Sequence, residues 1–179
     1  VPTVSSVTTA SDNKTIVVTF SEAVFSTNGG SGALDSADFA FSITGGAATL
    51  SSATPTSISI SGNVYTLGIG LSGTPDGSEV VTVIPVENAI YDAGGNVAST
   101  AQTNKTTSLF DQTAPNITSV TLAADNSTIA VVFSVAVFNT NAGSGAIDST
   151  DFAFLLPAVQ LPFLLQRPPK YLPAAISIP

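Results

Sequence analysis

A duplicated segment constrains the fold of this chain more than any other feature of its sequence. Residues 2–41 align without a gap on residues 115–154, and about 27 of the 40 aligned pairs are identical. The two copies lie about 113 residues apart, which is the length of a small globular domain rather than one turn of a solenoid. The sequence therefore predicts a complete repeat over residues 1–113 and the N-terminal part of a second repeat over residues 114–154.

The composition favours strands. Hydrophobic residues make up 44% of the chain and charged residues only 9%, which suits short, half-buried strands better than surface helices. Turn clusters rich in Gly, Asn, Asp and Pro separate segments with β-branched or alternating patterns. These segments are Val4–Thr9, Thr15–Phe20, Phe39–Thr44, Ser57–Ser61, Val64–Leu71, Glu79–Pro85 and Val97–Leu109. About seven short strands in one repeat predict an all-β fold with two packed sheets, including a hairpin that turns at Gly62-Asn63.

Four short motifs carry a family resemblance. They are VTFSEAVF at Val18–Phe25, ALDSADF at Ala33–Phe39, IYDAGGNVAS at Ile90–Ser99 and DQTAP at Asp111–Pro115. In this order, over residues 1–154, the chain resembles the bacterial immunoglobulin-like repeats of large adhesins and multidomain secreted proteins. The resemblance implies an immunoglobulin-like β-sandwich followed by a truncated copy. It also implies an exported spacer or presentation module, extracellular or on the cell surface, that calcium sometimes rigidifies.

Charge and missing residue types exclude several kinds of site. The net charge of −8 disfavours contact with nucleic acid or an anionic membrane, and no apolar run of about 18 residues predicts membrane insertion. The chain has no Cys and no His, so disulfides, thiolate metal sites and histidine bases are absent from its sequence. Hard cations bound by oxygen atoms, such as Ca²⁺, are the metal class that remains.

Carboxylates at one pole of each repeat form the candidate metal sites. In an immunoglobulin-like sandwich, the connections after the second and sixth strands share the pole where the chain enters. The residues expected there in the first repeat are Asp35, Asp38, Asp92, Asn96 and Glu22. The linker acid Asp111 is expected beside Asp148 and Asp151 of the second repeat. The alternative is that these residues only shape turns, and Val135 in place of Glu22 shows that this ligand is not present in each copy.

No catalytic arrangement is predicted. Glu79, Glu87 and Asp76 are interpreted as solvated or turn positions, and the many hydroxyl groups have no histidine to activate them. We therefore expect a non-catalytic spacer or adhesive repeat, with neighbouring repeats and a surface glycan or protein as partners. The alternative is an accessory, carbohydrate-associated β-sandwich of a secreted hydrolase.

The repeat pattern stops after Phe154. Residues 155–179 are proline-rich and lack glycine, whereas the first repeat predicts SITGGAA at this point. One base lost near codon 154 would turn codons for Ser-Ile-Thr-Gly-Gly-Ala into codons for Leu-Leu-Pro-Ala-Val-Gln, which is the sequence of residues 155–160. We interpret the tail as frameshifted, with a genuine proline-rich linker or membrane-proximal tail as the alternative.

A second repeat cut at this point would lack the sheet that covers its core face. Its inward residues should then be poorly packed: Ile129, Val131, Phe133, Phe138 and Phe152.

Overall fold

The computed structural model describes residues 1–141 and 143–155, and it divides the chain into two compact units, Val1–Ala114 and a second one that begins at Pro115. All strand pairs in the described residues are antiparallel. Their helical segments are two 3-10 turns, η1 (Ser36–Asp38) and η2 (Ser149–Asp151). The prediction of an all-β chain is confirmed. Within the described residues, no helix has the length and apolar character needed to cross a membrane.

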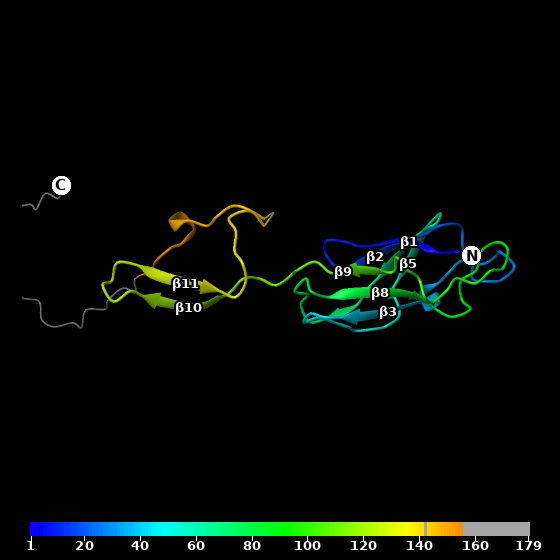
Figure 1. The fold of residues 1–179 in the computed structure, drawn as a ribbon, viewed down its shortest axis with the longest axis horizontal. Helices are drawn as coiled ribbons and strands as arrows, with labels where there is room; N and C mark the ends of the chain where they lie inside the picture. The colour runs from blue at the N-terminus through cyan, green and yellow to red at the C-terminus, as the bar shows by residue number, and fades with distance from the viewer. Residues whose placement is uncertain (142, 156–179) are drawn as a thin grey trace, which may run out of the picture. The chain divides into compact units, whose positions relative to one another are not determined.

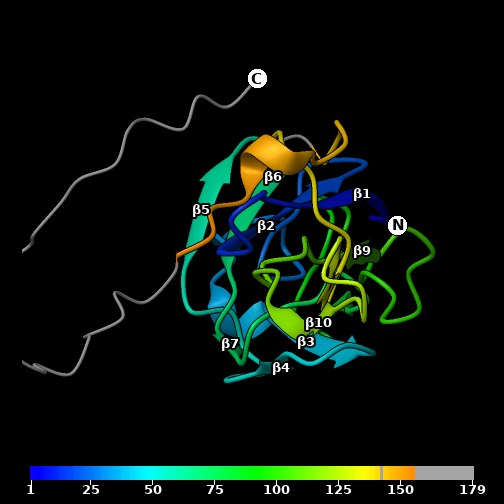
Figure 2. The ribbon, with the colours of Figure 1, turned by 90° about the vertical axis from the view of Figure 1, so that its left-hand side faces the viewer.

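The first unit contains two main sheets. The four-stranded sheet has the order β1-β2-β6-β5 and consists of β1 (Val4–Thr9), β2 (Thr15–Phe20), β6 (Val64–Gly68) and β5 (Ile58–Ser61). The three-stranded sheet has the order β3-β8-β9 and consists of β3 (Phe39–Thr44), β8 (Val80–Pro85) and β9 (Thr106–Ser108). A small pair, β4 (Thr49–Leu50) and β7 (Leu71–Ser72), completes the unit. Figures 1 and 2 show β2 and β5 on one side of the unit and β3 on the other.

Both sheets contribute to one core. Alternate residues of each strand point inward, because successive side chains in a strand lie on opposite faces. The rings of Phe20 on β2, Phe39 on β3 and Tyr65 on β6 pack together, with centroids 5.6–6.3 Å apart. Val81 and Val83 of β8 are fully buried in the same cluster. The inward faces of the two sheets therefore cover each other.

The sequence predicts the positions of most strands, but it predicts two strands that are longer than those in the structure. The predicted bounds of β1, β2 and β3 are confirmed, and Ser61 pairs with Val64 across the predicted hairpin turn. The strand predicted over Val64–Leu71 ends at Gly68, after which the chain moves to pair with β4. The strand predicted over Val97–Leu109 is reduced to β9. Its first half is a loop, held where Gln102 accepts a hydrogen bond from the Val4 amide.

The chain enters the first unit at one end and leaves it at the opposite end (Figure 1). The N-terminal pole carries Val1, which contacts Asp92. At the opposite end, β1 finishes beside β9, where the hydroxyl groups of Thr9 and Thr107 are 2.9 Å apart. This end, the C-terminal pole, also holds Gln112, whose amide donates to the Pro75 carbonyl. The chain therefore enters and leaves this unit at opposite poles.

The described residues of the second unit repeat the local structure of the first but do not form its buried core. Its described strands, β10 (Ile117–Leu122) and β11 (Ile129–Phe133), pair with the same register irregularity as β1 and β2. Ile129 is 40% exposed, whereas its counterpart Ile16 is fully buried. Phe138 is also exposed, and Val131, Phe133 and Phe152 are half-buried, in agreement with the expected loss of packing. Except for Leu155, the tail interpreted as frameshifted lies outside the described residues.

Candidate functional site

The N-terminal pole of the first unit brings two of its loops together. Phe25 and Tyr91 form an antiparallel bridge, which joins the loop after β2 to the loop after β8. Beside this bridge, the Val1 amine lies 3.7 Å from a Glu22 carboxylate oxygen and 3.3 Å from an Asp92 oxygen. The pole predicted from the sequence therefore contains Glu22, Asp92 and the Asn96 that Asp92 contacts.

Asp92 organises a tight turn. Its Oδ1 accepts hydrogen bonds from the amides of Gly94 and Asn96, both at 2.9 Å, and its Oδ2 accepts one from the Asn96 side chain at 2.8 Å. The Asn96 side chain and amide, together with the N-terminal amine and the Gly94 amide, lower the pKa of Asp92 to about 2 despite its desolvation. Its oxygens are therefore used mainly by neighbouring donors of its own turn.

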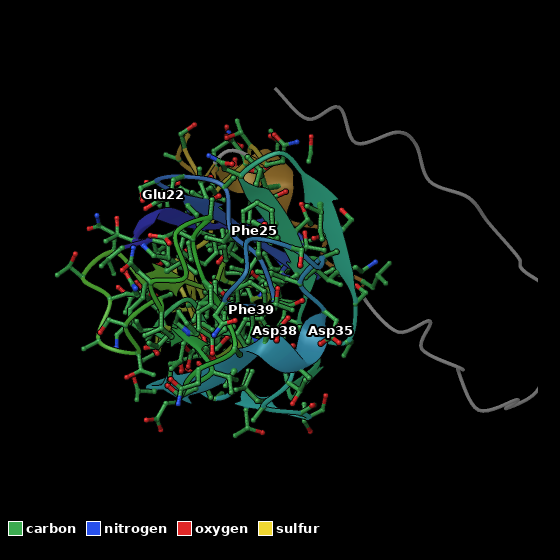
Figure 3. The ribbon with its side chains drawn as sticks, turned by 90° about the vertical axis from the view of Figure 1, so that its right-hand side faces the viewer. Glu22, Phe25, Asp35, Asp38 and Phe39 are labelled. Atoms are coloured by element: carbon green, nitrogen blue, oxygen red, sulfur yellow. The ribbon has the colours of Figure 1, made fainter. Side chains whose placement is uncertain are left out.

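Asp35 and Asp38 form a separate pair. They cap η1 reciprocally: Asp35 accepts from the Ala37 amide at 2.7 Å, and Asp38 accepts from the Asp35 amide at 2.8 Å. Burial raises the pKa of Asp38, and the charge of Asp35 adds to this, while the hydrogen bond from the Asp35 amide opposes it. Figure 3 shows the two carboxylates together, just before Phe39, with Glu22 apart from them.

The second candidate set is divided between the two units. Asp148 and Asp151 cap η2 as Asp35 and Asp38 cap η1, and hydrogen bonds from the Thr150 side chain and amide lower the pKa of Asp148. Asp111 belongs to the first unit, where it accepts from the Thr113 amide at 2.7 Å. The joint site predicted for Asp111, Asp148 and Asp151 stays a prediction.

The carboxylates do not form a metal site as they lie. Residues 1–141 and 143–155 contain no cluster of three or more His, Cys, Asp or Glu side chains that could hold a metal ion. Ca²⁺ needs six to eight oxygen ligands, whereas these oxygens accept hydrogen bonds within their own turns. Calcium binding stays a prediction. A site present in solution raises the melting temperature in millimolar Ca²⁺, and an unchanged value excludes it.

Glu79 is buried, whereas the sequence analysis predicted a solvated or turn position for it. Its carboxylate accepts from the amides of Ala47 and Ala48, both at 2.9 Å, and from those of Asp76 and Gly77 at 3.1 Å. The available signal was spacing: Glu79 directly precedes β8, and it continues by steps of two the series 81, 83 and 85, which are the buried residues of that strand.

The role of Glu79 is to join two turns. Burial opposes ionisation, but the hydrogen bonds from the Ala48 and Asp76 amides lower the pKa of Glu79 on balance. Gly46, at φ 64°, comes so close that a Cβ atom there would overlap the carboxyl group of Glu79. A charge that is satisfied by backbone donors in this way holds loops in place and presents no free acid for catalysis.

An apolar cavity of about 350 Å³ opens at the N-terminal pole. It lies between the loop after β2 and the β5–β6 turn, with Val24, Phe25, Leu34, Ile60 and Tyr65 among its lining residues. The Tyr65 hydroxyl donates weakly to the Val24 carbonyl at 3.4 Å. No carboxylate, amine or guanidinium group lines this cavity, so its chemistry is apolar contact.

Comparisons with known proteins give no family match and a distant structural similarity. No protein-family model matches the chain, and no curated protein matches it. Among solved structures, the N-terminal part of the bacterial S-layer protein SbsC is similar, with a TM-score of 0.39 and 20% sequence identity. The match covers 68% of this chain and 26% of that chain, so this chain corresponds to a small part of that structure. Neither a family nor an activity follows from this similarity.

Proposed function

We propose that this chain is part of a non-catalytic structural spacer, built from immunoglobulin-like β-sandwich repeats, in a protein of the bacterial cell surface. The observation that carries the proposal is the combination of a tandem copy, in which about 27 of 40 aligned pairs are identical, with a first unit that the chain enters and leaves at opposite poles (Figure 1). Units of this kind add length when they are repeated, because each copy starts where the previous one ends. Neighbouring repeats of the same chain are then its constant partners.

The composition of the first unit supports a passive role. Its buried acids, Glu79 and Asp92, accept hydrogen bonds from backbone amides, and its N-terminal cavity is apolar. The net charge of the whole chain, −8, favours solubility of an extended array and repulsion from anionic surfaces. A surface glycan or protein ligand, if the array displays one, belongs to the same proposal.

Tandem chains test the spacer function directly. Proteins with one, two, three and four copies of residues 1–114 are compared by small-angle X-ray scattering. We expect the maximum dimension to grow by a constant increment with each added copy. A radius of gyration that follows the scaling of one compact body would contradict the proposal.

The accessory-module alternative makes a different prediction. A carbohydrate-associated module of a secreted hydrolase binds insoluble polysaccharide, usually through exposed aromatic rings. In the described part of the first unit, Tyr65 is buried and Phe110 is an exposed ring. Retention of residues 1–114 on cellulose, chitin or peptidoglycan, lost on Phe110→Ala, would favour this alternative over the spacer.

A further inference from the structure

Neighbouring segments cover most edges of the two main sheets in the first unit. β1 and β9 lie at edges of different sheets, and they meet where the Thr9 and Thr107 hydroxyl groups are 2.9 Å apart. At the far edge of the β3-β8-β9 sheet, the Phe41 amide donates to the Ala53 carbonyl at 2.6 Å. β5 is the remaining edge, and among the described residues it pairs with β6 alone. Figure 2 shows β5 at the margin of the first unit.

The backbone groups of Ile58 and Ile60 point toward this open edge. Gly68 donates its amide to the Ser57 carbonyl at 2.9 Å, so Ser57 faces β6. In an antiparallel pair, successive residues direct their N–H and C=O groups alternately toward the partner strand and away from it. Ser59 therefore also faces β6, whereas the N–H and C=O groups of Ile58 and Ile60 face outward.

β5 has neither the charged residues nor the proline that commonly protect an edge strand from pairing. Residues 39–75 contain no charged side chain, although the whole chain has a net charge of −8. Ile60 is 44% exposed, and it lines the apolar cavity at the N-terminal pole. The edge therefore combines outward hydrogen-bonding groups with exposed apolar surface, and no charge on it repels a second copy of the chain.

The sequence of this edge is complementary to itself. Residues 57–61 read Ser-Ile-Ser-Ile-Ser in either direction. When two copies pair antiparallel about Ser59, each Ile58 lies opposite Ile60 of the second copy, and both residues already direct their backbone groups outward. The same register places Ser59 opposite itself, so apolar side chains meet apolar ones. A shift by one residue would place Ile opposite Ser, whose backbone groups β6 already uses.

We propose that the β5 edge is a homophilic contact site, at which the first unit pairs antiparallel with the same unit of a second chain. Backbone pairing at Ile58 and Ile60 sets the register, and contact between these isoleucines buries apolar surface. β1 runs from the N-terminal to the C-terminal pole, and β5 follows from it through three antiparallel pairings, so the two paired chains point in opposite directions. The contact goes beyond the spacer function, because it joins spacers that extend toward one another.

Engineered cysteines test the contact in the full chain, which has no Cys of its own. Ser59→Cys places a thiol opposite itself, at a non-hydrogen-bonded position where the two residues approach closely enough for a disulfide. Thr66→Cys is the matched control, because Thr66 lies beside Ser59 on β6, one strand farther from the edge. In a glutathione redox buffer, Ser59→Cys should form the covalent dimer at least about tenfold faster than Thr66→Cys. Equal rates overturn the proposal.

A mixed pair of variants tests the register independently of thiol exposure. Ser57 and Ser61 are both exposed, and they stand opposite each other in the proposed pair. Ser57→Cys and Ser61→Cys should therefore cross-link with each other at least about tenfold faster than either does with itself, because identical positions lie four residues out of register. A preference for either homodimer, or no preference, contradicts the antiparallel pairing.

Amide exchange tests the chain without cysteines. Exchange at Ile58 and Ile60 should slow as the chain concentration rises, whereas exchange at Ser59, which faces β6, should stay unchanged. Ser59→Lys sets two like charges opposite each other in the pair and should abolish this dependence. Ser42→Lys, the same change at an exposed position of β3, should preserve it. Exchange at both isoleucines that does not depend on chain concentration up to about 1 mM overturns the proposal.

Discussion

Glu79 carries a buried charge directly before the apolar strand β8, and backbone amides hold it there. Both of its oxygens face N–H donors, Oε1 the amides of Ala47 and Ala48, and Oε2 those of Asp76 and Gly77. An isosteric amide would keep one acceptor but turn an NH₂ group toward two of these donors. The contact therefore requires a carboxylate, and it ties the turn after β3 to the turn before β8.

Replacing that carboxylate should destabilise the first unit. Glu79→Gln is expected to lower the free energy of unfolding by about 2–3 kcal/mol, because buried amides lose a charged acceptor. Glu87→Gln, at an exposed position, is the matched control and should change it by less than about 0.5 kcal/mol. Urea unfolding of both variants measures the difference. Equal stabilities would mean that the Glu79 contact contributes nothing.

The low pKa of Asp92 predicts that the stability of the first unit depends on pH. Its pKa of about 2 lies below the ordinary 3.8, so the folded state binds this proton less readily than the unfolded state. Asp92 therefore contributes stability above pH 3.8, and the contribution is lost as the pH falls through about 2. A carboxyl NMR titration should give the low value in the wild type and a value closer to 3.8 in Asn96→Ala. Asn104→Ala, exposed and distant in sequence, should leave it unchanged.

Short elements of this chain are specified locally. The Asp-Ser-Ala-Asp and Asp-Ser-Thr-Asp segments both form a capped 3-10 turn, although the buried core formed by the described residues lies in the first unit. The β1–β2 and β10–β11 turns also agree, with Asn13 at φ 57° and Asn126 at φ 59°. Local hydrogen bonds and the tolerance of Asn for positive φ are sufficient to set these conformations.

The cap should nevertheless matter only where it supports packing. Asp35→Ala is expected to cost about 1 kcal/mol in the first unit, because η1 leads directly into the buried Phe39. Asp148→Ala removes the same cap in the second unit and should leave the unfolding midpoint of the first unit unchanged. Thermal unfolding of the two variants decides. Equal shifts in both would contradict this assignment.

Segments whose conformation is set locally were predictable from the sequence, whereas segments held by long-range contacts were not. Strands rich in β-branched residues, such as Thr15–Phe20, were predicted to the residue, and in the structure every second residue of this strand is buried. Val97–Leu109 was read as one strand, but long-range contacts decide its course, among them the Gln102 side chain that meets the Val4 amide. Of the candidate metal residues, Glu22, Asp92 and Asn96 lie together at the N-terminal pole, yet the direction of each carboxylate depends on its own turn, which spacing alone does not reveal.

The two units together form a controlled comparison of local sequence with tertiary context. β2 and β11 have Ile, Val and Phe at the same inward positions, and they pair in the same way with the preceding strand. β2 also pairs with β6 and faces a second sheet, whereas β11 leaves Ile129 and Val132 exposed, at 40% and 52%. If local sequence supplied most of the stability, both strands would be equally protected; if packing does, they differ greatly.

Native-state hydrogen exchange distinguishes these cases within one molecule. A first unit with ordinary stability of about 5–10 kcal/mol gives β2 amides protection factors of roughly 10⁴–10⁷. The β11 amides that pair with β10 should show protection of no more than about tenfold, since a two-stranded hairpin is marginal in water. Asp148→Ala should not alter the β2 values, because that cap lies in the other unit. High protection in β11 would mean that the second unit buries its apolar face in solution.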